Sequence, residues 1–182
     1  MRGIPQPIST PSNLRVNSMS SALPAQYHIF STLTSNGTDS MNTSGQTSAV
    51  TFSYSSTNPV MLHRAIVQIV DKGMNVTDFG GISGGLANGM EVCVTDSDST
   101  VLLDYTAGLP IKINSDWVRL AGVDVDRDSN TGAGDDGFSV RWTIAKSGVP
   151  LMLGSGQSFN FVVNDSLTAL TQFHVIVQGH AT

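Results

Sequence analysis

The spacing of apolar residues along the chain predicts a fold built mostly of β-strands. Apolar and polar residues alternate in five short segments, as they do in strands with one buried face and one wet face. The alternation is clearest in 138–144, where every second residue is large and apolar. The five segments are 27–33, 50–54, 138–144, 159–163 and 173–177.

Two further regions extend this interpretation. Residues 61–71 are apolar on both faces, which indicates a central strand covered on two sides, although a helix also fits this run. The turn-forming residues 96–99 separate 90–95 from 101–105, so these two segments are expected to form a hairpin.

Helical patterns are scarce in the chain. Only 76–79 and 115–120 could form helical turns, and strands do not alternate with helices as they do in α/β folds. The sequence therefore predicts an all-β fold, an antiparallel two-sheet sandwich. The uneven spacing of about eight strands favours a jelly roll.

The first 24 residues differ in composition from the rest. They hold four of the seven prolines among serine and asparagine, and their apolar residues are too sparse to form a core. We expect an extended N-terminal arm over 1–24 and a β-sandwich domain over 25–182. Ile4, Ile8 and Leu14 are predicted to dock on a partner, and a strap across the arm's own sandwich is the alternative.

Composition narrows the possible functions. Charged residues make up 13% of the 182 residues and the net charge is −5, with Arg2 and Arg15 as the only basic residues before position 64. A nucleic-acid partner is not expected from this charge distribution. No apolar run approaches the length of a membrane span and no secretory signal begins the chain, so we expect cytoplasmic synthesis and no membrane partner. The single cysteine, Cys93, is expected in the core.

An acidic run gives the strongest local signal for a ligand. Asp124, Asp126 and Asp128 occupy alternate positions, a spacing that resembles calcium-binding loops. Ser129 stands where the EF-hand loop requires glycine, and no helices flank the run, so an EF-hand is excluded. The two hypotheses are a calcium site in a loop at one end of the sandwich and a solvated acidic turn.

Motifs for catalysis lack their structural context. Residues 81–85 match G-x-S-x-G, with Asp124 and His174 following in the order of a hydrolase triad, but no helical pattern follows the serine. Residues 132–137 match G-x-G-x-x-G, but they lead into a strand and carry two carboxylates where a pyrophosphate would lie. The four histidines are not spaced along the chain as metal ligands are. They are His28, His63, His174 and His180. We therefore expect that the protein is not an enzyme and binds no cofactor other than the possible Ca²⁺.

Three segments in the second half of the chain carry a family resemblance: 121–126, 140–148 and 173–180. In these segments the chain resembles small virion-associated structural proteins of tailed bacteriophages. The resemblance implies a structural component of the particle, such as a head decoration (cement) protein or a tail or neck protein. It places no catalytic residue on this sequence.

The combined expectation is a capsid decoration protein, located in a virion that assembles in the host cytoplasm. Its partners would be the major capsid protein or another virion protein, and further copies of itself. Low charge and open strand edges favour a homo-oligomer, and the resemblance favours a trimer. The edges are expected at Thr51, Ser53 and Ser55.

Two other functions stay open at this point. A jelly-roll shell protein is less favoured because the arm has only two arginines to contact a genome. A carbohydrate-binding jelly roll, as in a receptor-binding or tail-associated module, would use calcium at the acidic run. Such a module needs aromatic rings free to stack on sugars. Trp117, Tyr105 and Phe79 are the possible exceptions to the predicted core faces, which hold Phe138, Trp142, Phe159, Phe161 and Phe173.

Overall fold

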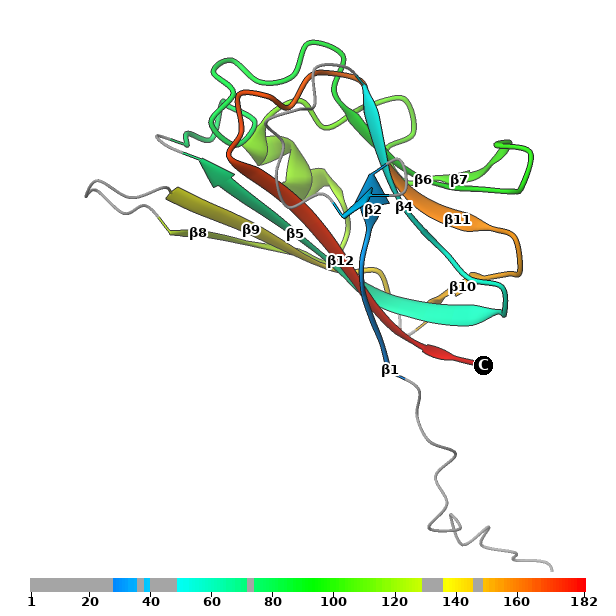
Figure 1. The fold of residues 1–182 in the computed structure, drawn as a ribbon. Helices are drawn as coiled ribbons and strands as arrows, with labels where there is room; N and C mark the ends of the chain where they lie inside the picture. The colour runs from blue at the N-terminus through cyan, green and yellow to red at the C-terminus, as the bar shows by residue number, and fades with distance from the viewer. Residues whose placement is uncertain (1–27, 36–37, 40–48, 72–73, 129–135, 146–148) are drawn as a thin grey trace, which may run out of the picture.

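The residues that the structure describes fold into two antiparallel β-sheets with one short 3₁₀ helix (Figure 1). This computed structural model describes residues 28–35, 38–39, 49–71, 74–128, 136–145 and 149–182. Within these residues each sheet has six strands, so the all-β, two-sheet prediction is confirmed. The chain forms more strands than expected because four short ones, of two to six residues, were not separately recognised: β2, β3, β8 and β10.

The first sheet, sheet A, has the strand order β1-β12-β5-β9-β8, and β10 pairs with the start of β5. The bounds are β1 His28–Thr32, β12 Gln172–Ala181, β5 Val60–Asp71, β9 Asp136–Thr143, β8 Val123–Asp128 and β10 Leu151–Leu153. Strand β5 pairs with β12 on one side and β9 on the other, which confirms a central strand and excludes the helix.

The second sheet, sheet B, has the strand order β3-β2-β4-β11-β6-β7. The bounds are β3 Thr38–Asp39, β2 Thr34–Ser35, β4 Val50–Ser55, β11 Ser158–Val163, β6 Met90–Thr95 and β7 Val101–Asp104. The β6–β7 pairing confirms the predicted hairpin. The 3₁₀ helix η1, Asn114–Arg119, occupies one of the two predicted helical turns.

The core lies between the two sheets. Buried residues at every second position of β9 face inward, as the alternation predicts, and Cys93 is buried as expected. Aromatic rings join the sheets: Phe52 of β4 and Phe173 of β12 have ring centroids 4.8 Å apart. The expectation that both faces of β5 are covered is wrong, because outward Gln68 is exposed and outward Ile66 is only half-buried.

Loops close one end of the sandwich beside η1. Buried Asn114 accepts a hydrogen bond from the Gly80 N–H (2.8 Å) and donates one to the Asn75 carbonyl (2.7 Å). These bonds connect η1 to residues 75–80, which lie far from it in sequence. The end of the core is therefore covered by a fixed cap.

Candidate interaction surfaces

The acidic residues singled out by the sequence lie on strand β8 and not in a loop. Asp124, Asp126 and Asp128 pair in register with Arg141, Ser139 and Gly137 of β9, and all three aspartates are exposed. The loop prediction is therefore wrong: the strand pairing with β9 extends through the acidic run. An extended strand separates its first and third aspartates by about 13 Å. Because calcium ligands lie about 2.3–2.6 Å from the ion, one ion cannot contact all three.

No group of three histidine, cysteine, aspartate or glutamate side chains in the described part of the chain could hold a metal ion. We expect the same melting temperature in millimolar calcium and in chelator, because a strand held by β9 would have to leave its sheet to enclose calcium. Thermal unfolding followed by circular dichroism measures this. A clear rise of the melting temperature in calcium would support the hypothesis of a calcium site at these aspartates.

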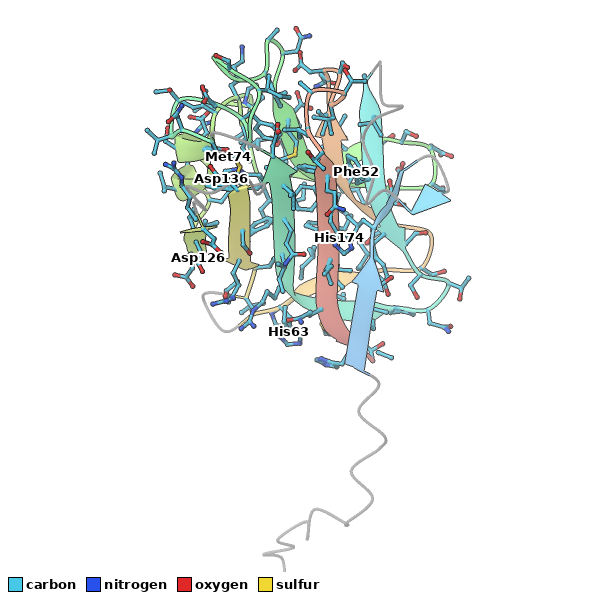
Figure 2. All side chains as sticks on the ribbon, turned by 60° about the vertical axis from the view of Figure 1, so that its left-hand side comes forward. Phe52, His63, Met74, Asp126, Asp136 and His174 are labelled. Atoms are coloured by element: carbon cyan, nitrogen blue, oxygen red, sulfur yellow. The ribbon has the colours of Figure 1, made fainter. Side chains whose placement is uncertain are left out.

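A shallow pocket of about 220 Å³ lies on the outer face of sheet A beside this strand. His174, Gln68, Ser139 and Asp126 line it as a row of register partners across β12, β5, β9 and β8. Figure 2 labels His174 and Asp126, the two ends of this row. Side-chain amide, hydroxyl, imidazole and carboxylate groups can all hydrogen-bond a small polar ligand. This row therefore offers several hydrogen-bonding groups to such a ligand.

The aromatic residues that sequence analysis left free for sugar stacking are unavailable. Trp117 and Phe79 are fully buried. Tyr105 packs edge-on against Trp142, with ring centroids 4.8 Å apart, and burial raises its pKa to about 12. The three possible exceptions to the core faces thus belong to the core or pack against it, because η1 and its flanking loops cover one end of the core.

The glycine-rich segment forms a turn within the cap. Ser83 is exposed, and the carboxylate of Asp78 accepts a hydrogen bond from the Gly84 N–H (3.1 Å), which lowers the Asp78 pKa. Asp124 and His174 lie on strands β8 and β12, with β9 and β5 between them. Three strand spacings amount to about 14 Å, so a hydrolase triad cannot form from these residues.

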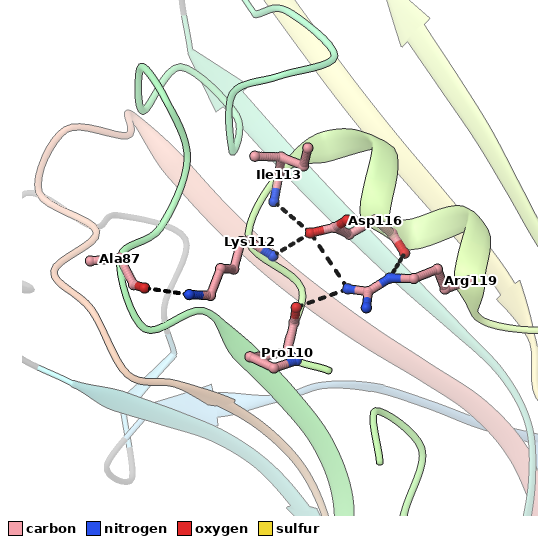
Figure 3. A network of polar contacts seen from close by, with 6 residues as sticks. All are labelled: Ala87, Pro110, Lys112, Ile113, Asp116 and Arg119. Atoms are coloured by element: carbon pink, nitrogen blue, oxygen red, sulfur yellow. Dashed lines mark hydrogen bonds and ion pairs between the residues drawn. The ribbon is translucent and has the colours of Figure 1, made fainter. Parts of the chain in front are cut away.

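A polar network fixes the loop that leads into η1 (Figure 3). The Asp116 carboxylate accepts hydrogen bonds from the backbone N–H groups of Lys112 (2.8 Å) and Ile113 (3.1 Å). Arg119 lies 3.5 Å from the same carboxylate and donates to the Pro110 carbonyl (2.8 Å). The side chains of Asp116 and Arg119 thus both hydrogen-bond backbone groups of this loop, so the network has a structural role.

Strand β7 is an open, apolar edge of sheet B. Among the described residues it pairs only with β6, and Val101, Leu102 and Leu103 are 56%, 50% and 41% exposed. An exposed apolar edge strand is a surface that pairs readily with another chain. By contrast, β8 at the edge of sheet A carries three aspartates and an arginine, and charged edges oppose such pairing.

The turn after β7 is held by a single carboxylate. Asp104 accepts hydrogen bonds from the Thr106 hydroxyl (2.7 Å), the Thr106 N–H (2.8 Å) and the Ala107 N–H (2.8 Å), and these bonds lower its pKa. A carboxyl with a lowered pKa stabilises the fold at neutral pH and loses that contribution as the pH falls through the lowered value. The end of β7 is therefore well defined at neutral pH.

The open edge predicted on β4 is wrong. Ser53 pairs with Asn160 of β11 on one side and with Thr34 of β2 on the other, so β4 lies inside sheet B. Thr51 and Ser55 lie on the same strand. The error arose because β2 has only two residues, too few for a hydrophobic pattern.

The structure brings together two histidines, His63 and His180, that no sequence pattern indicated. The Nε2 atom of His63 and the Nδ1 atom of His180 are 2.8 Å apart. The two residues are 117 positions apart, and only the pairing of β5 with β12 brings them together. No spacing rule along the chain could have found them, because their contact depends on strand order and register.

Some expectations fall outside the described residues. These are the arm 1–24 and its proposed docking residues Ile4, Ile8 and Leu14. In the part of the chain that the structure describes, no helix is long and apolar enough to cross a membrane. Comparisons of the chain with protein-family models, curated proteins and solved structures found no significant match.

Proposed function

We propose that this chain is a non-enzymatic structural protein of a bacteriophage particle, a capsid decoration protein that stabilises the head through protein–protein contacts. The observation that carries the proposal is strand β7, whose three apolar residues are between 41% and 56% exposed. In a monomer, such an edge favours aggregation. In a protein that packs against neighbouring subunits, the same edge provides an interaction surface. The resemblance to virion-associated proteins supports the same function.

The strand order supports a jelly roll as the architecture. Following the chain through its longer strands, β1 and β5 belong to sheet A, and β4 lies between them in sequence but belongs to sheet B. The last two strands, β11 and β12, lie inside sheets B and A respectively, each between earlier strands. Long connections that return the chain beside its first strands are characteristic of Greek-key folds such as the jelly roll.

The proposed assembly is a homotrimer. A three-fold interface is heterologous, so β7 of one subunit must meet a different surface of the next subunit. We assign Leu109 and Val118 to that second surface, because they are 63% and 70% exposed and lie outside β7. Pairing of β7 with itself would instead give a two-fold dimer.

We expect Leu102→Lys to convert the trimer to monomer, because the charge would have to be buried without a partner in the interface. Light scattering coupled to gel filtration of the full chain measures the mass. Val149→Lys is the matched control, because Val149 is 70% exposed but lies just before β10 of sheet A, away from the proposed interface. A monomeric wild type, or equal effects of the two variants, would contradict the assembly.

The test of the decoration function is binding to heads that lack the protein. Wild-type chain added to such heads should bind to saturation in multiples of three copies and raise their thermal stability. Leu102→Lys should fail to do so while Val149→Lys binds as wild type does. If neither the wild type nor the control variant binds, the chain is not a decoration protein of that particle.

The polar pocket on sheet A favours a second candidate, a carbohydrate-binding module. Gln68 and Ser139 lie at its centre and could hydrogen-bond sugar hydroxyls. Binding of a glycan at micromolar affinity, lost on Gln68→Ala and retained on Leu102→Lys, would favour this function over the first.

A further inference from the structure

Side chains that bind soft metal ions gather at one end of sheet A, on its outer face. Across two strand pairs the register aligns His180 of β12 with Met61 of β5, and Met61 with Met152 of β10. Residues directly opposite in antiparallel pairs share one face of a sheet. His63 is the extra residue of β5 where the register against β12 shifts, and its contact with the ring of His180 places it on the same face.

The two histidines already face one another through ring nitrogens. His63 Nε2 and His180 Nδ1 are 2.8 Å apart, with ring centroids 4.8 Å apart and the ring planes inclined by 31°. His63 lies at the end of sheet A opposite the cap (Figure 2). Burial and the neighbouring His180 lower the pKa of His63.

The chemistry of these side chains selects the metal. Imidazole nitrogen binds copper and zinc, whereas thioether sulfur from methionine favours the soft ion Cu(I). Both kinds of ligand lie in one row here, and Met152 is 63% exposed, so an ion has access to the row from solvent. We propose that this end of sheet A binds one Cu(I) ion through His63 Nε2 and His180 Nδ1, with the thioether of Met61 as the third ligand.

Binding needs only a small rearrangement. Two nitrogens that each lie about 2.0 Å from one ion in a trigonal site are about 3.5 Å apart. The histidine nitrogens would therefore separate by less than about 1 Å from their present hydrogen-bond distance. The proton on one facing nitrogen moves to the other nitrogen of the same ring, so each imidazole stays neutral and donates a lone pair to copper. No electron is transferred.

The test is competition of the full-length chain with a chromophoric Cu(I) chelator in a reducing buffer at neutral pH. We expect wild type to withdraw one copper per chain from the chelator. His63→Gln and His180→Gln should each weaken binding by more than about 100-fold, the upper end of what the loss of an outer-shell partner costs. Met61→Leu, which conserves volume, should weaken Cu(I) binding but leave Zn²⁺ binding close to wild type.

His174→Gln is the matched control, because His174 lies on the same strand and face as His180 but six residues away. It should bind copper as wild type does, and circular dichroism would show that each variant is folded. A wild type that takes no copper from the chelator would overturn the site. So would an equal loss in His174→Gln and His63→Gln, which would indicate that copper binding does not depend on the His63–His180 pair.

Discussion

Replacing Phe173 with alanine is expected to lower the free energy of unfolding by about 3–5 kcal/mol, the usual cost of removing a buried phenylalanine ring. Phe173 is fully buried on β12 and contacts Phe52 of the opposite sheet and Phe79 of the cap, with centroid distances of 4.8 and 6.2 Å. The ring thus joins both sheets and the cap in one place. Urea unfolding followed by tryptophan fluorescence measures the loss.

The control for this prediction is Phe173→Leu, which keeps most of the apolar volume. It should cost clearly less than the alanine variant, because a smaller cavity is left behind. If the alanine variant unfolded at nearly the wild-type urea concentration, the contact between the two sheets would not depend on this cluster of rings, and the central role of Phe173 in the core would be refuted.

Gly179→Ala is the second substitution with a large expected effect. Gly179 lies where the register of β12 against β5 shifts, and an added Cβ would overlap the Met61 carbonyl oxygen and lie 3.1 Å from the Leu62 Cα. These atoms are backbone atoms of a paired strand and cannot move aside cheaply. We expect a loss of about 3 kcal/mol, the upper end of the usual cost of overpacking.

Gly137→Ala is the matched control in the same sheet. Among the described residues, a Cβ at Gly137 would meet only the Asp128 Cβ, at 4.0 Å. Alanine there should leave stability unchanged or raise it slightly, because glycine in a strand costs conformational entropy. If both alanine variants lost the same amount of stability, the close approach of backbone atoms at Gly179 would not be the cause of the loss in Gly179→Ala. Urea unfolding of both variants, measured under the conditions used for Phe173→Ala, decides this.

The alternating pattern carried enough information to predict the strands that pack on the core. In β9, Phe138, Val140 and Trp142 are buried and face inward as their spacing indicates. The alternation works here because one face of the sheet is dry and the other is wet, so burial and sequence position have the same period. The all-β class follows from several such segments.

The surfaces were harder to predict because they depend on which strands are neighbours. The aspartates of β8 look like a loop in sequence, since aspartate is depleted in strands; their pairing with β9 makes them an edge. His63 and His180 meet only through the β5–β12 register. Strand order is set by contacts between distant segments, and a local pattern does not contain it.

The exposed edge strand β7 is a second surface that the local sequence pattern could not predict. Leu102 and Leu103 of β7 follow the turn that made the hairpin predictable, yet their apolar character suggests burial. The residues that would cover them do not come from the described part of this chain, in which β7 pairs only with β6. Under the proposed function, neighbouring protein subunits supply that cover.

Cryo-electron microscopy of the purified particle is the most direct test of the proposed function. We expect the two-sheet domain to fit density on the outer surface of the head, in groups of three, with β7 covered by a neighbouring subunit or by the shell. Absence of the chain from the particle, or a domain there whose β7 edge faces solvent, would contradict the proposed function.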